Sequence, residues 1–329
     1  MKKKHLVFAV LITFGIAVGV LNACNKDDLK GITNESVSFQ PRLSDYHIFS
    51  GNQRDLIPVE DYHLYSLATQ LFTDYAEKQR LIKIPQGTKL TKVDDGLPEF
   101  PDNTIIVKTF YYHHDKRNVN LGKRIIETRL LIKSKGIWNV ATYLWNADQT
   151  DATLLEGGTN TAVNWITETG EKKVIDYHVP NKRECATCHN SDDQIIPIGP
   201  KLRNLNFDVA VNGQATNQLK SFQNLGLLNS FDSHAVKSLP VAFSPNVSLE
   251  ESARAYLEMN CAHCHNPTGD AKKTDLFLQY VLPIDQTGIR KKGDKIVSKT
   301  QKGVMPLLGT TIIHMEGIQL IKDYIESLK

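Results

Sequence analysis

A five-residue pattern that occurs twice is the feature of this sequence that most limits what the chain can fold around. Residues 185–189 read Cys-Ala-Thr-Cys-His, and residues 261–265 read Cys-Ala-His-Cys-His. Both copies have the form C-x-x-C-H, the attachment signature of a c-type haem. Two thiols on one tight turn can each add across a vinyl group of the porphyrin, and the histidine that follows can bind the haem iron. The sequence therefore predicts two covalently attached haem c groups.

Each motif supplies two thiols and one iron ligand. In chain order these residues are Cys185, Cys188, His189, Cys261, Cys264 and His265. Zinc sites also use C-x-x-C pairs, but their two halves usually lie about 15–20 residues apart, far closer than these motifs. A thioredoxin-like dithiol needs one pair and no adjacent histidine, and plain disulfides are an alternative in an oxidising compartment. The histidine that ends both motifs favours haem.

The N-terminus has the pattern of a lipoprotein export signal. Three lysines precede an apolar run over residues 6–21, and residues 21–24, Leu-Asn-Ala-Cys, resemble a bacterial lipobox. This resemblance implies that residues 1–23 are a cleaved signal peptide and that Cys24 carries the lipid, which holds the protein on a membrane when more than one acyl chain is present. An uncleaved membrane anchor is the alternative, although the apolar run is slightly shorter than the ~20 residues of a span.

The residues after Cys24 and the net charge of the chain bear on the protein's localisation and on its binding partners. Residues 25–28, Asn-Lys-Asp-Asp, resemble the export tag of Bacteroidetes lipoproteins, which implies an outer-membrane protein on the cell surface. Otherwise these residues are a solvated linker, within a tether at 24–42, and the protein lies on the periplasmic side of a membrane. The formal net charge of +3 is too small to indicate a nucleic-acid partner. The expected partner is a redox protein or a small redox molecule.

The first half of the mature chain is expected to be rich in strands. Short runs of β-branched and aromatic residues alternate with turns, which is typical of an antiparallel sandwich or barrel. The expected strands are 80–84, 104–112, 125–133, 137–145, 163–166 and 174–178, with a hairpin turn at 169–171. Apolar spacing over 62–76 predicts a short helix before them. We place this β-rich domain at residues 43–179.

The second half is expected to be mostly helical. One helix is predicted over 218–228, and the capping-box pattern Ser-Leu-Glu-Glu at 248–251 opens another over 249–259. Apolar residues on one face predict a last helix over 312–328. We divide this half into a first haem region at 180–247 and a second haem domain at 248–329. The predicted fold class is α+β and multidomain.

Two short segments resemble class I cytochromes c. Residues 199–202, Gly-Pro-Lys-Leu, stand where that family has a proline whose carbonyl accepts the N–H of the proximal histidine. The resemblance implies that Pro200 does this for His189, and an ordinary loop proline is the alternative. Met305, followed by Pro306, stands at the family's axial-ligand position, which implies that His265 and Met305 bind the second iron and that the thioether raises its potential. A structural role is the alternative for Met305.

The same family packs its first helix closely against its last. Ala253, Ala255 and Gly317 are the small residues expected at that contact. The first haem has no equivalent of the second haem's methionine, so its sixth position is expected to be a histidine, an outside ligand or open. The candidate histidines are His113, His114, His178 and His234.

Most of the mature chain resembles a family of bacterial di-haem c-type cytochromes with an N-terminal β-domain and a C-terminal class I cytochrome c-like domain. The segments that carry the resemblance are 71–76, 107–112, 126–132, 143–146, 150–152, 197–206, 255–257, 260–267 and 305–309. Residues 100–111 also resemble, more weakly, the β-domain of cytochromes that oxidise hydroxylamine, which have a single C-terminal haem motif.

Two functions follow from these expectations. The favoured one is electron transfer through two haems, to or from a redox partner. The alternative is a haem enzyme, in which the Met-ligated haem supplies electrons to a first haem with an open site that reduces peroxide or oxidises a small nitrogen compound. The sixth ligand of the first haem distinguishes the two.

Overall fold

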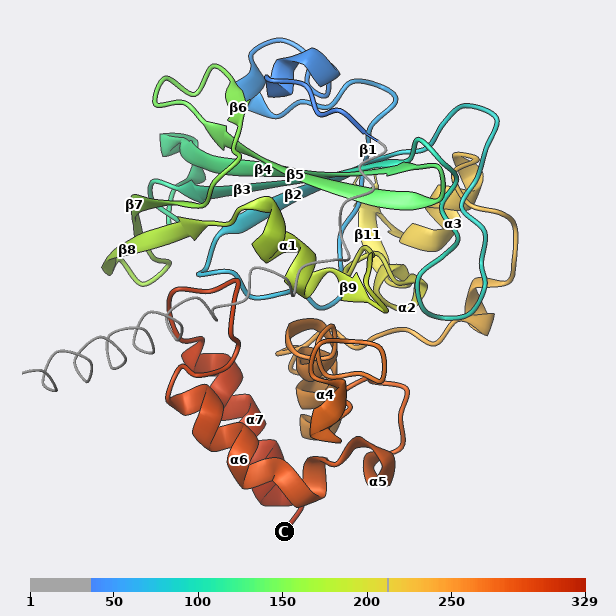
Figure 1. Ribbon diagram of the computed structural model, residues 1–329, viewed down its shortest axis with the longest axis vertical. Coiled ribbons are helices and arrows are strands. Elements are labelled where there is room, and N and C mark those ends of the chain that lie inside the picture. Colours follow the sequence, from blue (N-terminus) through green and yellow to red (C-terminus); the bar gives the residue numbers. More distant parts are fainter. Residues whose placement is uncertain (1–36, 212) are drawn as a thin grey trace, which may run out of the picture. The chain divides into compact units, whose positions relative to one another are not determined.

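Six antiparallel strands form the central sheet of the computed structural model, which describes residues 37–211 and 213–329. They follow one another in the order β1 to β6, so that each strand pairs with its neighbour in sequence (Figure 1). Their bounds are β1 His63–Leu64, β2 Glu77–Lys83, β3 Ile105–His113, β4 Lys123–Ser134, β5 Ile137–Trp145 and β6 Ala152–Leu154. The predicted signal peptide and Cys24 lie outside the described residues.

The strand predictions are confirmed, including the pair β7 Thr159–Ile166 and β8 Lys172–Val179, which forms a separate two-stranded ribbon. The predicted helix over 62–76 is wrong. The amide N–H groups of this segment are bonded to distant partners: Tyr65 donates to the carbonyl of Arg80, Ala68 to that of Asn204, and Phe72 to the Asn260 side chain. These bonds hold the segment extended, because the same amides are then unable to donate within a helix.

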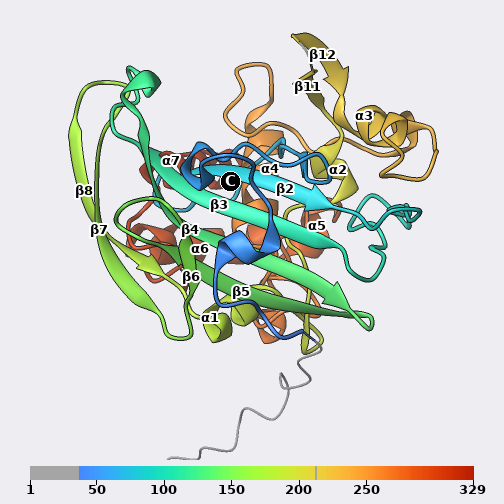
Figure 2. The same cartoon turned by 90° about the horizontal axis from the view of Figure 1, so that it is seen from above.

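Apolar side chains alternate along the strands and divide the sheet into two faces. One face is covered by the segment that precedes β1, which carries the short 3-10 helices η1 (Leu43–Tyr46) and η2 (Gln53–Asp55). Figure 2 shows this blue segment crossing the sheet. Leu43 and Ile48 pack there against Val107, Leu130 and other side chains of the same face.

The second face is covered by the β7–β8 ribbon at one end and by the chain after residue 180 at the other. Val163 and Trp165 of the ribbon pack on Phe110 and Tyr112 of β3. The elements after residue 180 are α1 Lys182–Cys188, β9 Asn190–Ser191, β10 Gln194–Ile195, α2 Leu202–Leu205, β11 Asp208–Val211, β12 Gln214–Asn217, α3 Gln218–Asn224 and η4 Ser233–Ala235. The short helix η3 Val119–Leu121 lies earlier, in the loop between β3 and β4. This face is therefore the one that meets the first C-x-x-C-H motif.

The C-terminal part is helical, as predicted. It contains α4 Leu249–Asn260, η5 Lys272–Thr274, α5 Ile284–Thr287, α6 Ile289–Gln301 and α7 Met315–Ser327. The expected capping box of α4 is present, since the Ser248 hydroxyl accepts from the Glu251 N–H and the Glu251 carboxylate accepts from the Ser248 N–H. Within the described residues, no helix is both long and apolar enough to cross a bilayer.

Helices α4 and α7 pack through a small residue, as expected. A Cβ atom added to Gly317 would overlap the Tyr256 hydroxyl, so only glycine allows this approach. Ala253 belongs to the same core as Ile321 and Tyr324 of α7. Ala255 instead points into the core shared with the sheet.

The predicted α+β class is confirmed at the level of an antiparallel sheet followed by a mostly helical part. The domain boundaries at 180 and 248 stay predictions. The described residues, 37–211 and 213–329, belong to one compact unit, and one core joins Ile106 of β3, Cys185 of α1 and Met259 of α4. The core therefore crosses both boundaries.

Candidate haem attachment site

The first motif lies on the short helix α1 and its C-terminal end. Asn181 caps this helix by accepting from the Glu184 N–H, and the Glu184 carboxylate accepts from the Asn181 N–H in return. Cys185 points into the core beneath the sheet, where its sulfur lies 3.7 Å from the Thr142 hydroxyl of β5. His189 directly follows the helix, with its N–H bonded to the Cys185 carbonyl. The last turn of α1 and the residue that follows it therefore carry both thiols and the imidazole.

The second motif follows α4 without a break. The amides of Cys264 and His265 both donate to the carbonyl of Cys261, at 3.1 and 2.9 Å, which folds the five residues into a tight turn. The carbonyl of His265 accepts from the Leu278 N–H at 2.9 Å. This turn brings both thiols and the imidazole together, which covalent attachment of one porphyrin requires.

The structure brings the two motifs into contact, although they are far apart in sequence. The Cys188 and Cys264 thiols lie close enough for each to shift the pKa of the other. Beside them the Asn190 amide donates to Asp270 at 2.8 Å, and the hydroxyls of Ser191 and Thr268 lie 2.9 Å apart. The turns after the two motifs therefore form one interface.

The four cysteines are free thiols in different environments. The hydrogen bond with Cys264 lowers the pKa of Cys188 against the opposing effect of burial, and His263 lowers it further. Burial raises the pKa of Cys261 to about 12. Burial therefore favours the protonated thiol at Cys261, whereas the thiolate is the reactive form of cysteine.

Both motif histidines are suited to bind a metal as neutral imidazoles. The Nδ1 atom of His189 lies 2.7 Å from the Ile196 carbonyl, which fixes the tautomer that leaves Nε2 as the metal-binding nitrogen. Burial lowers the pKa of His189 to about 3. The Nδ1 atom of His265 lies 3.4 Å from the Thr274 hydroxyl, and burial lowers the pKa of His265 as well. Both side chains are thus held neutral and oriented by a second group, which fits a haem-iron ligand.

Pro200 does not occupy the position expected of it. The carbonyl next to the His189 ring is that of Ile196, so the expectation that the Pro200 carbonyl accepts the His189 N–H is wrong. The hairpin β9–β10 turns the chain back immediately after the motif, and the Ile196 N–H donates to the His189 carbonyl at 2.8 Å. Ile196 therefore reaches the imidazole first, and Pro200 is a buried loop proline.

Met305 lies in the loop between α6 and α7, and its side chain is half-buried. Its N–H donates to the Lys299 carbonyl at 3.2 Å. The far end of the loop is tied to the segment before β2, because the Asp74 carboxylate accepts from the amides of Thr311 and Ile312 at 2.9–3.1 Å. The loop is thus held at both ends, and ligation of the second iron by Met305 stays a prediction.

The candidate sixth ligands of the first haem differ in their freedom to bind iron. Both ring nitrogens of His178 have partners, Asn160 at 2.7 Å and Glu184 at 2.9 Å. His234 is exposed and bonded to Asp232. No group in the described part of the chain bonds to the buried Nδ1 atom of His113, and His114 lies against Gly122. Two of the four candidates, His178 and His234, are therefore already hydrogen-bonded to other side chains.

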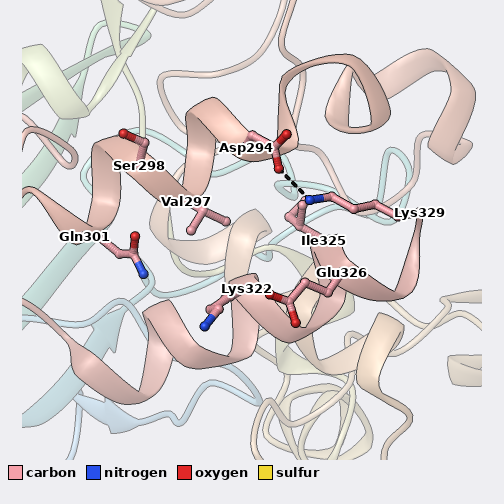
Figure 3. Close-up of a pocket in the computed structure, with 8 residues that line it drawn as sticks. All are labelled: Asp294, Val297, Ser298, Gln301, Lys322, Ile325, Glu326 and Lys329. Carbon is pink, nitrogen blue, oxygen red and sulfur yellow. Dashed lines mark ion pairs between the residues drawn. The ribbon is translucent and has the colours of Figure 1, made fainter.

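Other sites in the described residues do not compete with the motifs. Within residues 37–211 and 213–329, no group of three or more His, Cys, Asp or Glu side chains is placed to hold a metal ion. A surface hollow of about 320 Å³ lies between α6 and α7, lined by side chains such as Asp294, Lys322 and Lys329 (Figure 3). None of the motif residues lines it, so it has no part in haem attachment.

Sequence reasoning missed four basic side chains on the sheet face that meets the first motif. They are Lys78 and Arg80 of β2, Lys108 of β3 and Arg129 of β4. A signal was present in the sequence for three of them, because Arg80, Lys108 and Arg129 each stand next to an apolar residue of the opposite face, namely Leu81, Val107 and Leu130.

Comparison with protein-family models, curated proteins and solved structures found no match to this chain.

Proposed function

We propose that the chain is a di-haem c-type cytochrome that transfers single electrons between its two haems and a redox partner. The contact between the two C-x-x-C-H motifs is the observation that carries this proposal. Asn190 donates to Asp270 and the Ser191 hydroxyl is bonded to that of Thr268, so the two attachment turns are adjacent in space. Adjacent attachment is the arrangement that passes an electron from one haem to the other within the protein.

The residues fit the group that this function needs. A bound haem would supply reversible one-electron chemistry at its iron. Cys185, Cys188 and His189 would hold one haem, and the second motif would hold the other. The Ile196 carbonyl fixes the ring orientation of His189 and raises the basicity of its Nε2 atom. The apolar core behind Cys185 excludes water from that side of the site.

The direct test is the haem content of the full chain, produced in a host that attaches haem c. We expect two covalent haems by intact mass and by pyridine haemochrome absorbance. Changing Cys185 and Cys188 to Ser should leave one haem, and changing Cys261 and Cys264 to Ser should also leave one. A wild-type protein without haem, or with a mass that matches bound zinc, would contradict the proposal.

A haem enzyme is the second candidate, and the state of the histidines favours it. His178 is bonded at both ring nitrogens and His234 is exposed on the surface. A first haem without a side-chain sixth ligand is open to a small molecule. Binding of cyanide or imidazole to the ferric wild-type protein at one haem supports this candidate. A first haem that resists both ligands supports transfer alone.

We also propose that the helical part after residue 248 is a class I cytochrome c-like domain and that the protein is an exported lipoprotein of the outer membrane. The packing of α4 on α7 at Gly317 supports the first statement, since that family pairs its first and last helices. The lipobox-like residues 21–24 support the second.

Cys24→Ser is expected to abolish lipidation and release the protein from the membrane fraction, or to leave it with an uncleaved signal peptide. The reason is that the acyl chains on this sulfur are the proposed anchor. Membrane fractionation and intact mass measure both outcomes. The neighbouring substitution Asn25→Ser is the control and should leave the protein lipidated. A wild-type mass without acyl chains would refute the proposal.

A further inference from the structure

Basic side chains form a row across the sheet beside the first motif. The strand register places Arg80 of β2 opposite Lys108 of β3, Lys108 opposite Arg129 of β4, and Arg129 opposite Thr142 of β5. Residues directly opposite one another in a sheet point to the same face. The row therefore runs across four strands and ends at Thr142, whose hydroxyl lies 3.7 Å from the Cys185 sulfur.

This row carries more positive charge than its surroundings balance. Arg129 is paired, because its guanidinium binds both oxygens of Glu127 at 2.5 and 2.8 Å, and Tyr177 donates to the same carboxylate at 2.6 Å. Arg80 is 5% exposed and donates to the uncharged amide of Gln70 at 3.0 Å, and no carboxylate of the described residues forms an ion pair with it. Within the described residues, Lys108 has no ion-pair partner and lies over the ring of Phe110.

Uncompensated charges in such a place are costly. Like charges directly opposite one another on a sheet destabilise it, and a buried charge without a partner is strongly destabilising. Burial, followed by repulsion from Arg80 and Arg129, lowers the pKa of Lys108 well below its usual range. A bound anion would remove the repulsion, so the row has the charge of a site for carboxylates.

The position of the row matches the shape of a haem attached at the first motif. A porphyrin carries its two propionates on the edge that lies across the ring from the vinyl carbons, to which the cysteine sulfurs bond. Neighbouring strands lie about 4.8 Å apart, so β3 and β2 lie roughly 10 and 14 Å from β5. Lys108 and Arg80 therefore stand across the sheet face from Cys185, at a separation that a porphyrin attached there can span.

We propose that Lys108 and Arg80 bind the propionate carboxylates of the haem attached at Cys185 and Cys188. The inference rests on the proposed function and assigns a role to the sheet, which completes the binding site of the first haem. Arg129 takes no part as a partner, because Glu127 already neutralises it. A free oxyanion in solution offers the same chemistry as a propionate, and the experiment has to separate the two.

The test is a spectroelectrochemical titration of the full holoprotein, with Lys108→Gln, Arg80→Gln and the charge-preserving Lys108→Arg. We expect each Gln variant to lower one of the two reduction steps by at least a tenfold change in the ferrous-to-ferric ratio, or about 59 mV for one electron. Removing a cation leaves the propionate charge unbalanced, which disfavours the added electron. Lys108→Arg should keep the wild-type step.

Lys83→Gln is the matched control. Lys83 is on the same strand, but it pairs with Asp61 and lies over Tyr62 on the other face of the sheet. This variant should move neither step. In Lys108→Gln, the shifted step should also gain a dependence on pH in the mildly acidic range, because carboxylates without a cation titrate nearer to their ordinary pKa.

The outcomes are distinct. Two intact haems whose steps are unchanged in Lys108→Gln and Arg80→Gln would overturn the inference and leave the proposed function standing. Adding sodium sulfate to the wild type, at ionic strength matched with sodium chloride, should have no saturable effect. A saturable shift that Lys108→Gln abolishes would show that the cations are free for an oxyanion, and would also overturn it. A protein without haem has no reduction steps, and that result is a failure of the proposed function.

Discussion

Glu258→Gln is expected to destabilise the folded protein by about 3–5 kcal/mol, the usual cost of removing one partner from a buried ion pair. Glu258 lies on α4 and is 1% exposed. One of its carboxylate oxygens lies 2.5 Å from the Lys201 ammonium, and the other accepts from the Tyr280 N–H at 2.7 Å. The substitution would leave Lys201 without a compensating charge.

The effect should depend on pH in a defined direction. Burial alone would raise the pKa of Glu258, but the charge and hydrogen bond of Lys201, with the bond from Tyr280, outweigh it and hold the pKa below the ordinary value of 4.5. A carboxyl whose folded pKa is depressed contributes its stability fully above its unfolded pKa, and the contribution is lost as the pH falls through the folded pKa. The difference between wild type and variant should therefore shrink below about pH 4.5.

Urea unfolding of the holoprotein at neutral and acidic pH measures both expectations, provided that the slope with denaturant is unchanged. Glu250→Gln is the control on the same helix. The Glu250 side chain is 58% exposed and lies 3.9 Å from Arg254, so its removal should cost only about 0–1 kcal/mol. Equal losses in the two variants, or a gap that stays constant into acid, would contradict the argument.

This ion pair connects the chain near one C-x-x-C-H motif with the chain near the other. Its loss should therefore destabilise the packing of both motifs. Lys201 belongs to the segment after the first motif, and Glu258 precedes the second by less than one turn of helix. The pair also lies beside Arg203, whose N–H donates to the Asp95 carbonyl at 2.9 Å. Stability of the motif interface thus depends on a contact that neither motif contains.

Local patterns in the sequence were enough to predict most strands and helices. Strands β3 to β5 alternate apolar residues on two faces, and α4 begins at a capping box, so the information lies within a few neighbouring residues. The segment over 62–76 shows where this fails. Its apolar spacing suits a helix, but the amides of Tyr65, Ala68 and Phe72 donate to residues far away in the chain. Tertiary hydrogen bonds override local preference there.

The candidate site was predictable in its chemistry and not in its geometry. The thiols and imidazoles of both motifs follow from the spacing alone. The partner of His189 does not, because a short hairpin inserts Ile196 where the class I resemblance placed Pro200. The contact between the two motifs and the row from Arg80 to Arg129 depend on how strands and motifs pack, which spacing along the chain does not encode.

Met305→Ala is expected to lower the reduction potential of the second haem by at least a tenfold change in its ferrous-to-ferric ratio, about 59 mV for one electron. A thioether is a soft, neutral ligand that favours ferrous iron, so its loss favours the ferric state. The loop that carries Met305 is held by its bond to Lys299 and by the bonds of Thr311 and Ile312 to Asp74. The substitution should therefore remove a ligand without releasing the loop.

The ferric wild-type protein should show the weak near-infrared band of sulfur-to-iron charge transfer, with the intensity of one haem, and Met305→Ala should abolish it. Met315→Ala is the matched control, since this methionine is 65% exposed at the start of α7 and should leave both band and potential unchanged. A band that survives Met305→Ala, or an intensity that requires two Met-ligated haems, would refute the assignment.

Because no methionine lies between His189 and Ala255, the first haem should keep its potential in the variant. The two irons are then unequal, and the Met-ligated second haem is the one that holds an electron more tightly. An electron that enters at the first haem is therefore expected to pass to the second.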